Sequence, residues 1–193
     1  MENKKNNTFK EFISPVLVLV IICFAVTLIL SFAYGITSPI IEKNAAKAAA
    51  ETRTALLESA EGQFEEYSGD LLVYEKDKVY VKDCYKASNG SGVVITACAN
   101  SYGGTLTAMI GIDKDGAITA VKVTEASDTP GVGDKAQKEG HLAQYKGLDT
   151  LTSDEVKKDG TVQAVTGASV SSGAIHKAVY CALEQFKEMG GVK

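Results

Sequence analysis

The chain has 193 residues, enough for one domain with an additional segment, and its 20 basic and 24 acidic residues give a net charge of −4. The lack of a basic surplus argues against nucleic-acid binding. Its two histidines, His141 and His176, lie far apart, and no HExxH, CxxC or histidine cluster occurs, so we expect no dedicated metal site.

The first predicted element is a membrane-spanning helix. Residues 15–34 form a run of twenty residues without a charge, and a helix of that length rises about 30 Å, which matches a bilayer's hydrocarbon core. The alternative is a cleaved signal peptide, but its apolar core is usually about 7–15 residues long and precedes a small-residue cleavage site. We therefore expect an N-terminal segment at 1–13 and an uncleaved transmembrane helix at 14–37.

The charges beside this span predict its orientation. Lys4, Lys5 and Lys10 precede it, whereas Glu42 and a single Lys43 follow it. The positive-inside rule then places the N-terminus in the cytoplasm and the rest of the chain outside a cell membrane that it crosses once.

A helical stalk and a folded domain follow the span. Residues 38–62 are alanine-rich and charged, which favours a helix. From residue 63 the pattern changes to apolar runs separated by turn residues, followed by helical patterns, which predicts an α+β domain at 63–193 with a mainly antiparallel sheet and flanking helices. The expected strands are 71–77, 78–87, 92–99, 105–113, 117–126 and a short one at 161–165, and the last helix runs from about 169 to Met189.

The four cysteines are Cys23, Cys84, Cys98 and Cys181. A disulfide between Cys84 and Cys98 is one interpretation, although a hairpin turning at residues 89–90 places Cys84 nearer to Thr96 than to Cys98. The other interpretation is that these residues are buried free thiols.

Hydroxyl side chains crowd the start of the last helix. They belong to Thr166, Ser169, Ser171 and Ser172, beside the small pair Gly167-Ala168. One serine would cap the helix. A glycine-flanked helix start with further hydroxyl donors also suits a phosphate group. A nucleophilic serine is disfavoured, because the G-x-S-x-G pattern is absent and His176 lies about 10 Å further along the helix from Ser169.

The segment T-G-A-S-V-S at 166–171 resembles the [S/T]-G-A-[S/T]-x-[S/T] flavinylation motif of FMN-binding domains. Such domains occur in the G subunit of the Rnf electron-transport complex and in the C subunit of the sodium-pumping quinone reductase. Residues 101–136 resemble the family's central block, with a Y-G-G strand start, a hairpin and a T-P-G-x-G loop. The Q-Y-K-G element at 144–147 and T-S-P-I-I-E after the span also fit, and the short form is most similar to the Rnf protein.

The resemblance implies that Ser169 carries FMN, covalently attached through its phosphate, and that a separate flavin transferase makes the bond. Thr166 would be a second possible acceptor, and Ser171 and Ser172 would cap the helix or bind phosphate oxygens. The chain differs from the family pattern in two respects. The fourth motif residue, which is often Thr in the family, is Ser169 here. The family usually has Asp three residues before the motif, where the transferase is expected to recognise it, and this chain has Gln163 there.

The loop at 128–133 has two interpretations. Pro130 and Gly131 suit the central positions of a turn. The resemblance implies in addition that the loop lies against the flavin, with Gly131 and Gly133 allowing close approach to the ring system and Thr129 making a polar contact. Tyr102 would pack in the core or contact the ring.

The resemblance implies an electron-transfer subunit of a membrane ferredoxin:NAD oxidoreductase coupled to sodium or proton movement, with no catalysis of its own. Its partners would be the membrane and the other subunits, including a membrane-embedded flavoprotein, with Ser31 and Ala33 as small contact positions on the span. The alternatives are an anchored module that binds a phosphate-containing ligand non-covalently, and an unflavinylated structural subunit, which the substitution at Gln163 keeps open.

Overall fold

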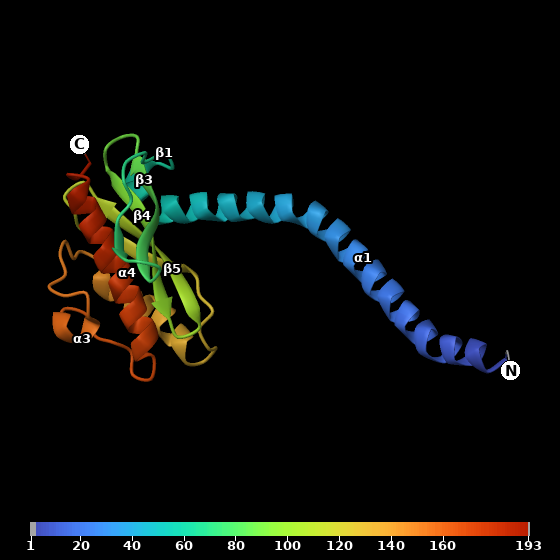
Figure 1. Cartoon of the computed structure of the whole chain (residues 1–193). Helices are drawn as coiled ribbons and strands as arrows, with labels where there is room; N and C mark the ends of the chain where they lie inside the picture. The colour runs from blue at the N-terminus through green and yellow to red at the C-terminus, as the bar shows by residue number, and fades with distance from the viewer. Residues whose placement is uncertain (1–2, 193) are drawn as a thin grey trace. The chain divides into compact units, whose positions relative to one another are not determined.

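The computed structural model describes residues 3–192, with side chains from residue 13 onward. The chain divides into one unit that ends at Ala49 and a second that begins at Ala50. Helix α1, Asn3–Leu56, bends along its length (Figure 1), and it contains Pro39, which has no N–H to donate to the preceding turn. Among the described residues it is the one helix long and apolar enough to cross a membrane. The side chains of the three N-terminal lysines lie outside the described set.

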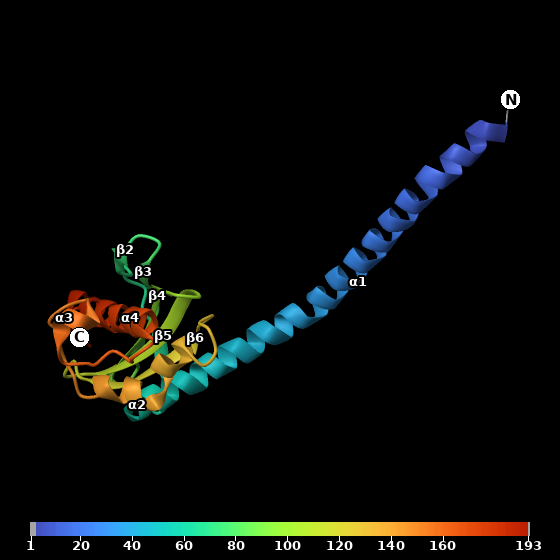
Figure 2. The ribbon, with the colours of Figure 1, turned by 90° about the horizontal axis from the view of Figure 1, so that it is seen from below.

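The second unit consists of a sheet and several short helices around one long helix (Figures 1 and 2). The strands are β1 (Phe64–Glu66), β2 (Val73–Glu75), β3 (Val79–Ala87), β4 (Gly92–Ser101), β5 (Gly104–Asp113) and β6 (Ile118–Glu125). The helices are η1 (Glu58–Ala60), η2 (Gly133–Gln137), α2 (Glu139–Leu142), η3 (Ala143–Tyr145), α3 (Val156–Asp159) and α4 (Ser169–Glu188).

The sheet is antiparallel and has the order β1-β3-β4-β5-β6, with β2 also paired to β3. Consecutive strands from β3 to β6 are neighbours, because each is joined to the next by a short turn rich in Gly, Asn or Asp. The predicted α+β class and both main hairpins are therefore confirmed. Strand β1 was not predicted from the sequence.

Both faces of the sheet are covered, which explains why β4 is buried at nearly every position. Helix α4 packs on β3, β4 and β5 with its apolar stripe, whose buried members include Ile175, Val179 and Leu183. On β6, the Thr119 hydroxyl donates to the Leu56 carbonyl, and a Cβ on Gly111 would lie 2.6 Å from that oxygen. The last residue of α1 is thus fixed to the sheet.

The predicted short strand at 161–165 is wrong. This segment is irregular because side chains occupy the backbone groups that a neighbouring strand would bind. Asp159 accepts the Thr161 N–H at 3.1 Å, and the Gln163 N–H donates to Gln144 Oε1 at 2.9 Å. The chain therefore reaches α4 as a loop held by these side chains.

The cysteines are free thiols, and the possible disulfide is excluded. Cys84 lies opposite Ile95 in the β3–β4 ladder, one residue from the expected Thr96, and Cys98 lies opposite Tyr80. Burial raises the pKa of Cys84 and of Cys181 to about 12, so these thiols remain protonated and unreactive.

Candidate functional site

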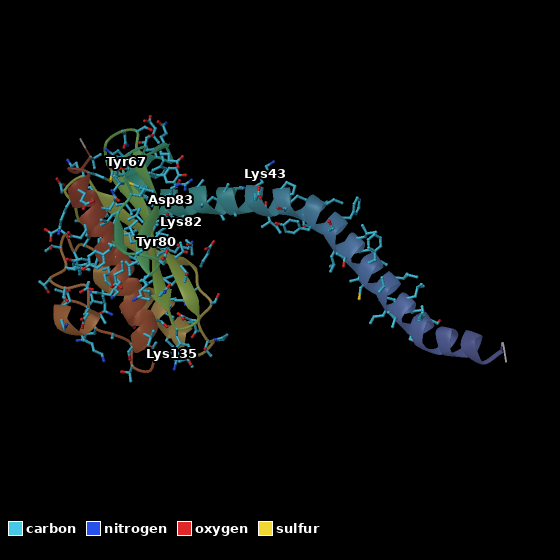
Figure 3. All side chains as sticks on the ribbon, viewed as in Figure 1. Lys43, Tyr67, Tyr80, Lys82, Asp83 and Lys135 are labelled. Carbon is cyan, nitrogen blue, oxygen red and sulfur yellow. The ribbon has the colours of Figure 1, made fainter. Side chains whose placement is uncertain are left out.

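A cavity of about 440 Å³ lies where the 128–133 loop meets the start of α4. It brings together the two sequence motifs, the T-P-G-V-G loop and T-G-A-S, which are more than thirty residues apart in the chain. Its lining residues are Tyr102, Asp128, Thr129, Val132, Gly133, Gly167, Ala168, Ser169, Val170 and Ser171. Lys135, in the short helix that follows the loop, lies at the opposite end of the domain from Tyr67 (Figure 3).

The two motifs enter the cavity through turns of the same kind. The Val132 N–H donates to the Thr129 carbonyl at 3.1 Å, and the Ala168 N–H donates to the Val165 carbonyl at 2.9 Å. Gly131 and Gly167, the third residues of these turns, have φ of +80° and +81°. Positive φ at this position, after Pro130 or Thr166 whose φ is not positive, is typical of a type II turn and favours glycine, so the expected turn at Pro130-Gly131 is confirmed.

The start of α4 presents unpaired backbone donors. Ala168 is the N-cap residue and makes no side-chain capping bond, and the helical ladder begins with the Ser172 N–H donating to the Ala168 carbonyl. The preceding N–H groups, from Ser169 to Ser171, are those that a helix leaves without an internal partner. The expectation that a serine caps the helix is wrong, because the residue in the cap position is an alanine.

The hydroxyls of the motif lie in different environments. Ser169 is exposed and lines the cavity. Ser171 is buried, lines the cavity and lies beside Asp128. Ser172 is buried and accepts the Val165 N–H at 3.0 Å, so it stabilises the preceding turn. Thr166 is exposed and, like Ser172, Pro130 and Gly131, is not part of the cavity lining.

Asp128 is a lining residue that the sequence reasoning did not assign. It accepts hydrogen bonds from the Ser101 hydroxyl at 2.7 Å and from the Gly103 N–H at 3.1 Å. Partial burial raises the pKa of this carboxyl, but the hydrogen bonds from Ser101, Gly103, Ser171 and Gln137 together lower it below its usual value. Asp128 is therefore ionised at neutral pH.

Large apolar side chains are exposed around the cavity. Tyr102 is 77% exposed, Val170 56% and Val132 48%. Tyr102 is thus on the surface, and the interpretation that it packs in the core is wrong. Val132 and Val170 were missed because a single valine between two glycines or two serines carries no signal in a sequence.

The Q-Y-K-G element does not line the cavity, and its Tyr145 contacts His176 of α4 in the core of the domain. Tyr145 is fully buried, and its hydroxyl lies 3.3 Å from His176 Nδ1. His176 Nε2 lies 2.9 Å from the Ser153 carbonyl oxygen. Because a carbonyl only accepts, Nε2 carries the proton and Nδ1 accepts from Tyr145. Within the described residues no group of His, Cys, Asp or Glu side chains could hold a metal ion.

Comparison with known proteins identifies the family. Residues 101–184 match the model of the FMN-binding domain. The chain is 30% identical over 184 residues, covering 91% of each chain, to the G subunit of the proton-translocating ferredoxin:NAD(+) oxidoreductase complex of Clostridium ljungdahlii. It is 29% identical, over 89% of this chain and 88% of the relative, to the G subunit of the ion-translocating oxidoreductase complex of Aliivibrio fischeri.

Among solved structures, the crystal structure of Shewanella oneidensis NqrC matches 54% of this chain and 57% of its own, with 22% identity and a TM-score of 0.44. The matched FMN-binding region contains every residue that lines the cavity. The similarity to the Clostridium protein extends over nine-tenths of both chains, and the chain therefore belongs to the family of G subunits of ion-translocating oxidoreductase complexes and contains its FMN-binding domain.

Proposed function

We propose that this chain carries FMN on Ser169, attached through a phosphoester bond, and passes electrons within an ion-translocating ferredoxin:NAD oxidoreductase complex. One observation carries the proposal: the exposed hydroxyl of Ser169 opens into a cavity that the T-P-G-V-G loop and Tyr102 also line.

The cavity suits the two parts of FMN. Its volume of about 440 Å³ lies in the range of cofactor pockets. The unpaired N–H groups at the start of α4 favour a phosphate group. Tyr102, Val132 and Val170 offer exposed apolar surface that a planar ring system would cover.

Among the candidate hydroxyls, Ser169 is the attachment point that the geometry favours. Thr166 is exposed but lies outside the cavity lining, and the oxygen of Ser172 is already bound to the Val165 N–H. In the reaction that we propose, the Ser169 oxygen forms a bond to the FMN phosphorus of a flavin dinucleotide as the bond to the departing AMP breaks. The serine proton leaves to solvent or to a base of the flavin transferase.

The proposed cofactor supplies the redox chemistry, and the domain binds and orients it. A covalent link keeps the flavin on a domain outside the cytoplasm, which follows from the proposed topology of residues 14–37 as a single span with the N-terminus inside. The partners are the other subunits of the complex, including a membrane-embedded flavoprotein, and the flavin transferase during maturation. The Clostridium ljungdahlii relative is named proton-translocating, and the coupled ion here would be a proton or sodium.

In-gel fluorescence tests this proposal. The full chain would be produced with a flavin transferase, denatured and compared with Ser169→Ala, Ser169→Thr and Thr166→Ala. We expect a fluorescent band in the unmodified chain, in Ser169→Thr and in Thr166→Ala, and none in Ser169→Ala. A band that persists in Ser169→Ala would move the link to another hydroxyl. Flavin that is lost from every variant on denaturation would instead favour non-covalent binding of a phosphate-containing ligand.

A further inference from the structure

Three separate backbone segments line the cavity: the turn at Tyr102, the 128–133 loop and the start of α4. Asp128 belongs to the loop, and its carboxylate contacts the other two segments. It accepts hydrogen bonds from Ser101 at the end of β4 and from Gly103 in the turn that follows. It also lies beside Ser171 in the first turn of α4, since a Cβ on Gly133 would lie 2.9 Å from the Asp128 Cγ and 2.8 Å from the Ser171 Oγ. Asp128 itself begins the 128–133 loop, so one side chain links all three segments.

Two glycines allow these segments to approach closely. A Cβ on Gly103 would lie 1.9 Å from the Ser127 carbonyl oxygen. A Cβ on Gly133 would lie 2.6 Å from the Asp128 Cβ and 2.8 Å from the Ser171 Oγ. Because any larger residue at either position would overlap with these atoms, the junction around Asp128 is close-packed, and a change of this side chain moves its neighbours.

The residues that Asp128 holds flank the two functional positions. Tyr102 stands between Ser101 and Gly103, both of which donate to the carboxylate, and it is otherwise 77% exposed. Ser169 lies two residues before Ser171. We propose that Asp128 is a positioning residue that holds the Tyr102 ring against the flavin tethered at Ser169; this inference rests on the proposed function.

Flavin fluorescence reports this geometry, since a tyrosine ring stacked on a flavin quenches its emission by donating an electron to the excited state. The full chain, loaded by a flavin transferase, would be compared with Asp128→Ala, Tyr102→Leu and the double variant. The measured quantity is the emission yield per covalently bound flavin. We expect both single variants to raise the yield toward that of free FMN, and the double variant to add nothing to Tyr102→Leu, because Asp128 acts through Tyr102.

Asp159→Asn is the matched control. Like Asp128, Asp159 is a carboxylate that accepts several hydrogen bonds from a loop, but it is buried and does not line the cavity. Its substitution lowers the melting temperature and leaves the emission yield unchanged. If Asp128→Ala does not fold or load, Ser101→Ala removes one donor, keeps the carboxylate and is expected to raise the yield partway.

The outcomes distinguish a failure of the proposed function from a failure of the role proposed for Asp128. A wild-type chain without covalent flavin removes the proposed function and this inference together. A loaded wild-type chain whose yield is the same in Asp128→Ala, or in Ser101→Ala where the first variant fails, removes the inference alone. The inference also falls if Tyr102→Leu leaves the yield unchanged, or if the effects of Asp128→Ala and Tyr102→Leu are additive.

Discussion

Gln163 stands where the resemblance to the flavinylation motif leads us to expect Asp, and the structure shows the contacts of this residue. Its N–H donates to Gln144 Oε1 at 2.9 Å, and Gln144 Nε2 lies 3.5 Å from its carbonyl oxygen. The Gln163 residue is exposed. The backbone of Gln163 is thus held by Gln144, while the residue remains accessible at the surface.

We predict that Gln163→Asp accelerates flavin loading of the full chain, because it restores the carboxylate that the transferase is expected to recognise. Fluorescence of the denatured chain, sampled during incubation with transferase and flavin dinucleotide, measures the rate. Thr161→Ser, a mild change two residues away, is the control. An equal or slower rate for Gln163→Asp would mean that this transferase reads other features of the loop.

His141 is a second residue whose state follows from its partners. Gln144 uses its oxygen for the Gln163 N–H, so its Nε2 donates to His141 Nδ1 at 3.1 Å. The His141 proton is then on Nε2, which is buried without a hydrogen-bond partner. Burial lowers the pKa of this imidazole, which is therefore neutral in the folded domain at pH 7.

We predict that His141→Phe is close to neutral at pH 7.5 and stabilising at pH 5.5. The phenyl ring retains the edge contact with Tyr145 and removes a buried unpaired donor, which costs about 1–3 kcal/mol. It also removes the acceptor of Gln144 Nε2, so the two effects offset each other at pH 7.5. Since the folded pKa is lowered, the stabilising effect of neutral His141 is present above the unfolded value of ~6.5 and is lost as pH falls through the folded value. Melting curves at the two pH values measure this, and a loss of several degrees at pH 5.5 would contradict it.

At the scale of elements, the turn between β4 and β5 is fixed against the 127–128 segment by the absence of a side chain at Gly103. We predict that Gly103→Ala destabilises the domain by about 1–3 kcal/mol through overpacking. Gly173→Ala is the matched control: this helical glycine in α4 has no atom within 4 Å of an added Cβ, so alanine stabilises the helix by about 0.5–1 kcal/mol. Urea unfolding of both variants measures the difference in stability. Equal unfolding midpoints for Gly103→Ala and Gly173→Ala would show that the turn accommodates an added Cβ without loss of stability.

The elements that the sequence predicted correctly are those with a strong local signal. The β3–β4 and β5–β6 hairpins follow from apolar runs around the turns at Asn89-Gly90 and Asp115-Gly116, and α4 follows from its apolar spacing. The segment 161–165 was mistaken for a strand because its partners are the side chains of Asp159 and Gln144, which no local pattern reveals.

The candidate site shows the same division. The turn at Pro130-Gly131 was predictable because its third position favours glycine at positive φ, which Gly131 has. T-G-A-S was recognised only by its resemblance to the flavinylation motif, and the turn at Gly167 was not predicted. The role of Asp128 was not recognisable, since its donors come from segments before and after it in the chain. Long-range hydrogen bonds of this kind appear only once the fold brings the segments together.

For the molecule as a whole, stability in acid depends on groups whose pKa folding lowers. Asp159 accepts hydrogen bonds from Thr152, Ser153 and Thr161, and although burial raises its pKa, these bonds lower it overall. Burial lowers the pKa of His176 and of His141. Each of these groups stabilises the fold above its unfolded pKa, and this effect is lost as pH falls through the lower, folded value.

We predict that the melting temperature of the domain is highest near pH 7, declines as pH falls below ~6.5 because of the histidines, and falls again below ~4 because of the carboxylates. Asp159→Asn removes part of the second decline and costs about 1–3 kcal/mol at neutral pH through its weakened hydrogen bonds. Thermal unfolding of the full chain in detergent between pH 3 and pH 8 measures both declines of the melting temperature. The pH values at which they begin are the pKa values of His and Asp in the unfolded chain. A flat profile between pH 7 and pH 5 would contradict the role given to the histidines.

The whole account depends on one covalent bond, and mass spectrometry of a single peptide tests it most directly. Trypsin releases the peptide from Asp159 to Lys177, which contains Gln163, Thr166 and every serine of the motif. After production with a flavin transferase, we predict that this peptide gains the mass of FMN less one water and that fragmentation places the added mass on Ser169. An unmodified peptide from a folded chain, or an added mass on another residue, would contradict the central claim.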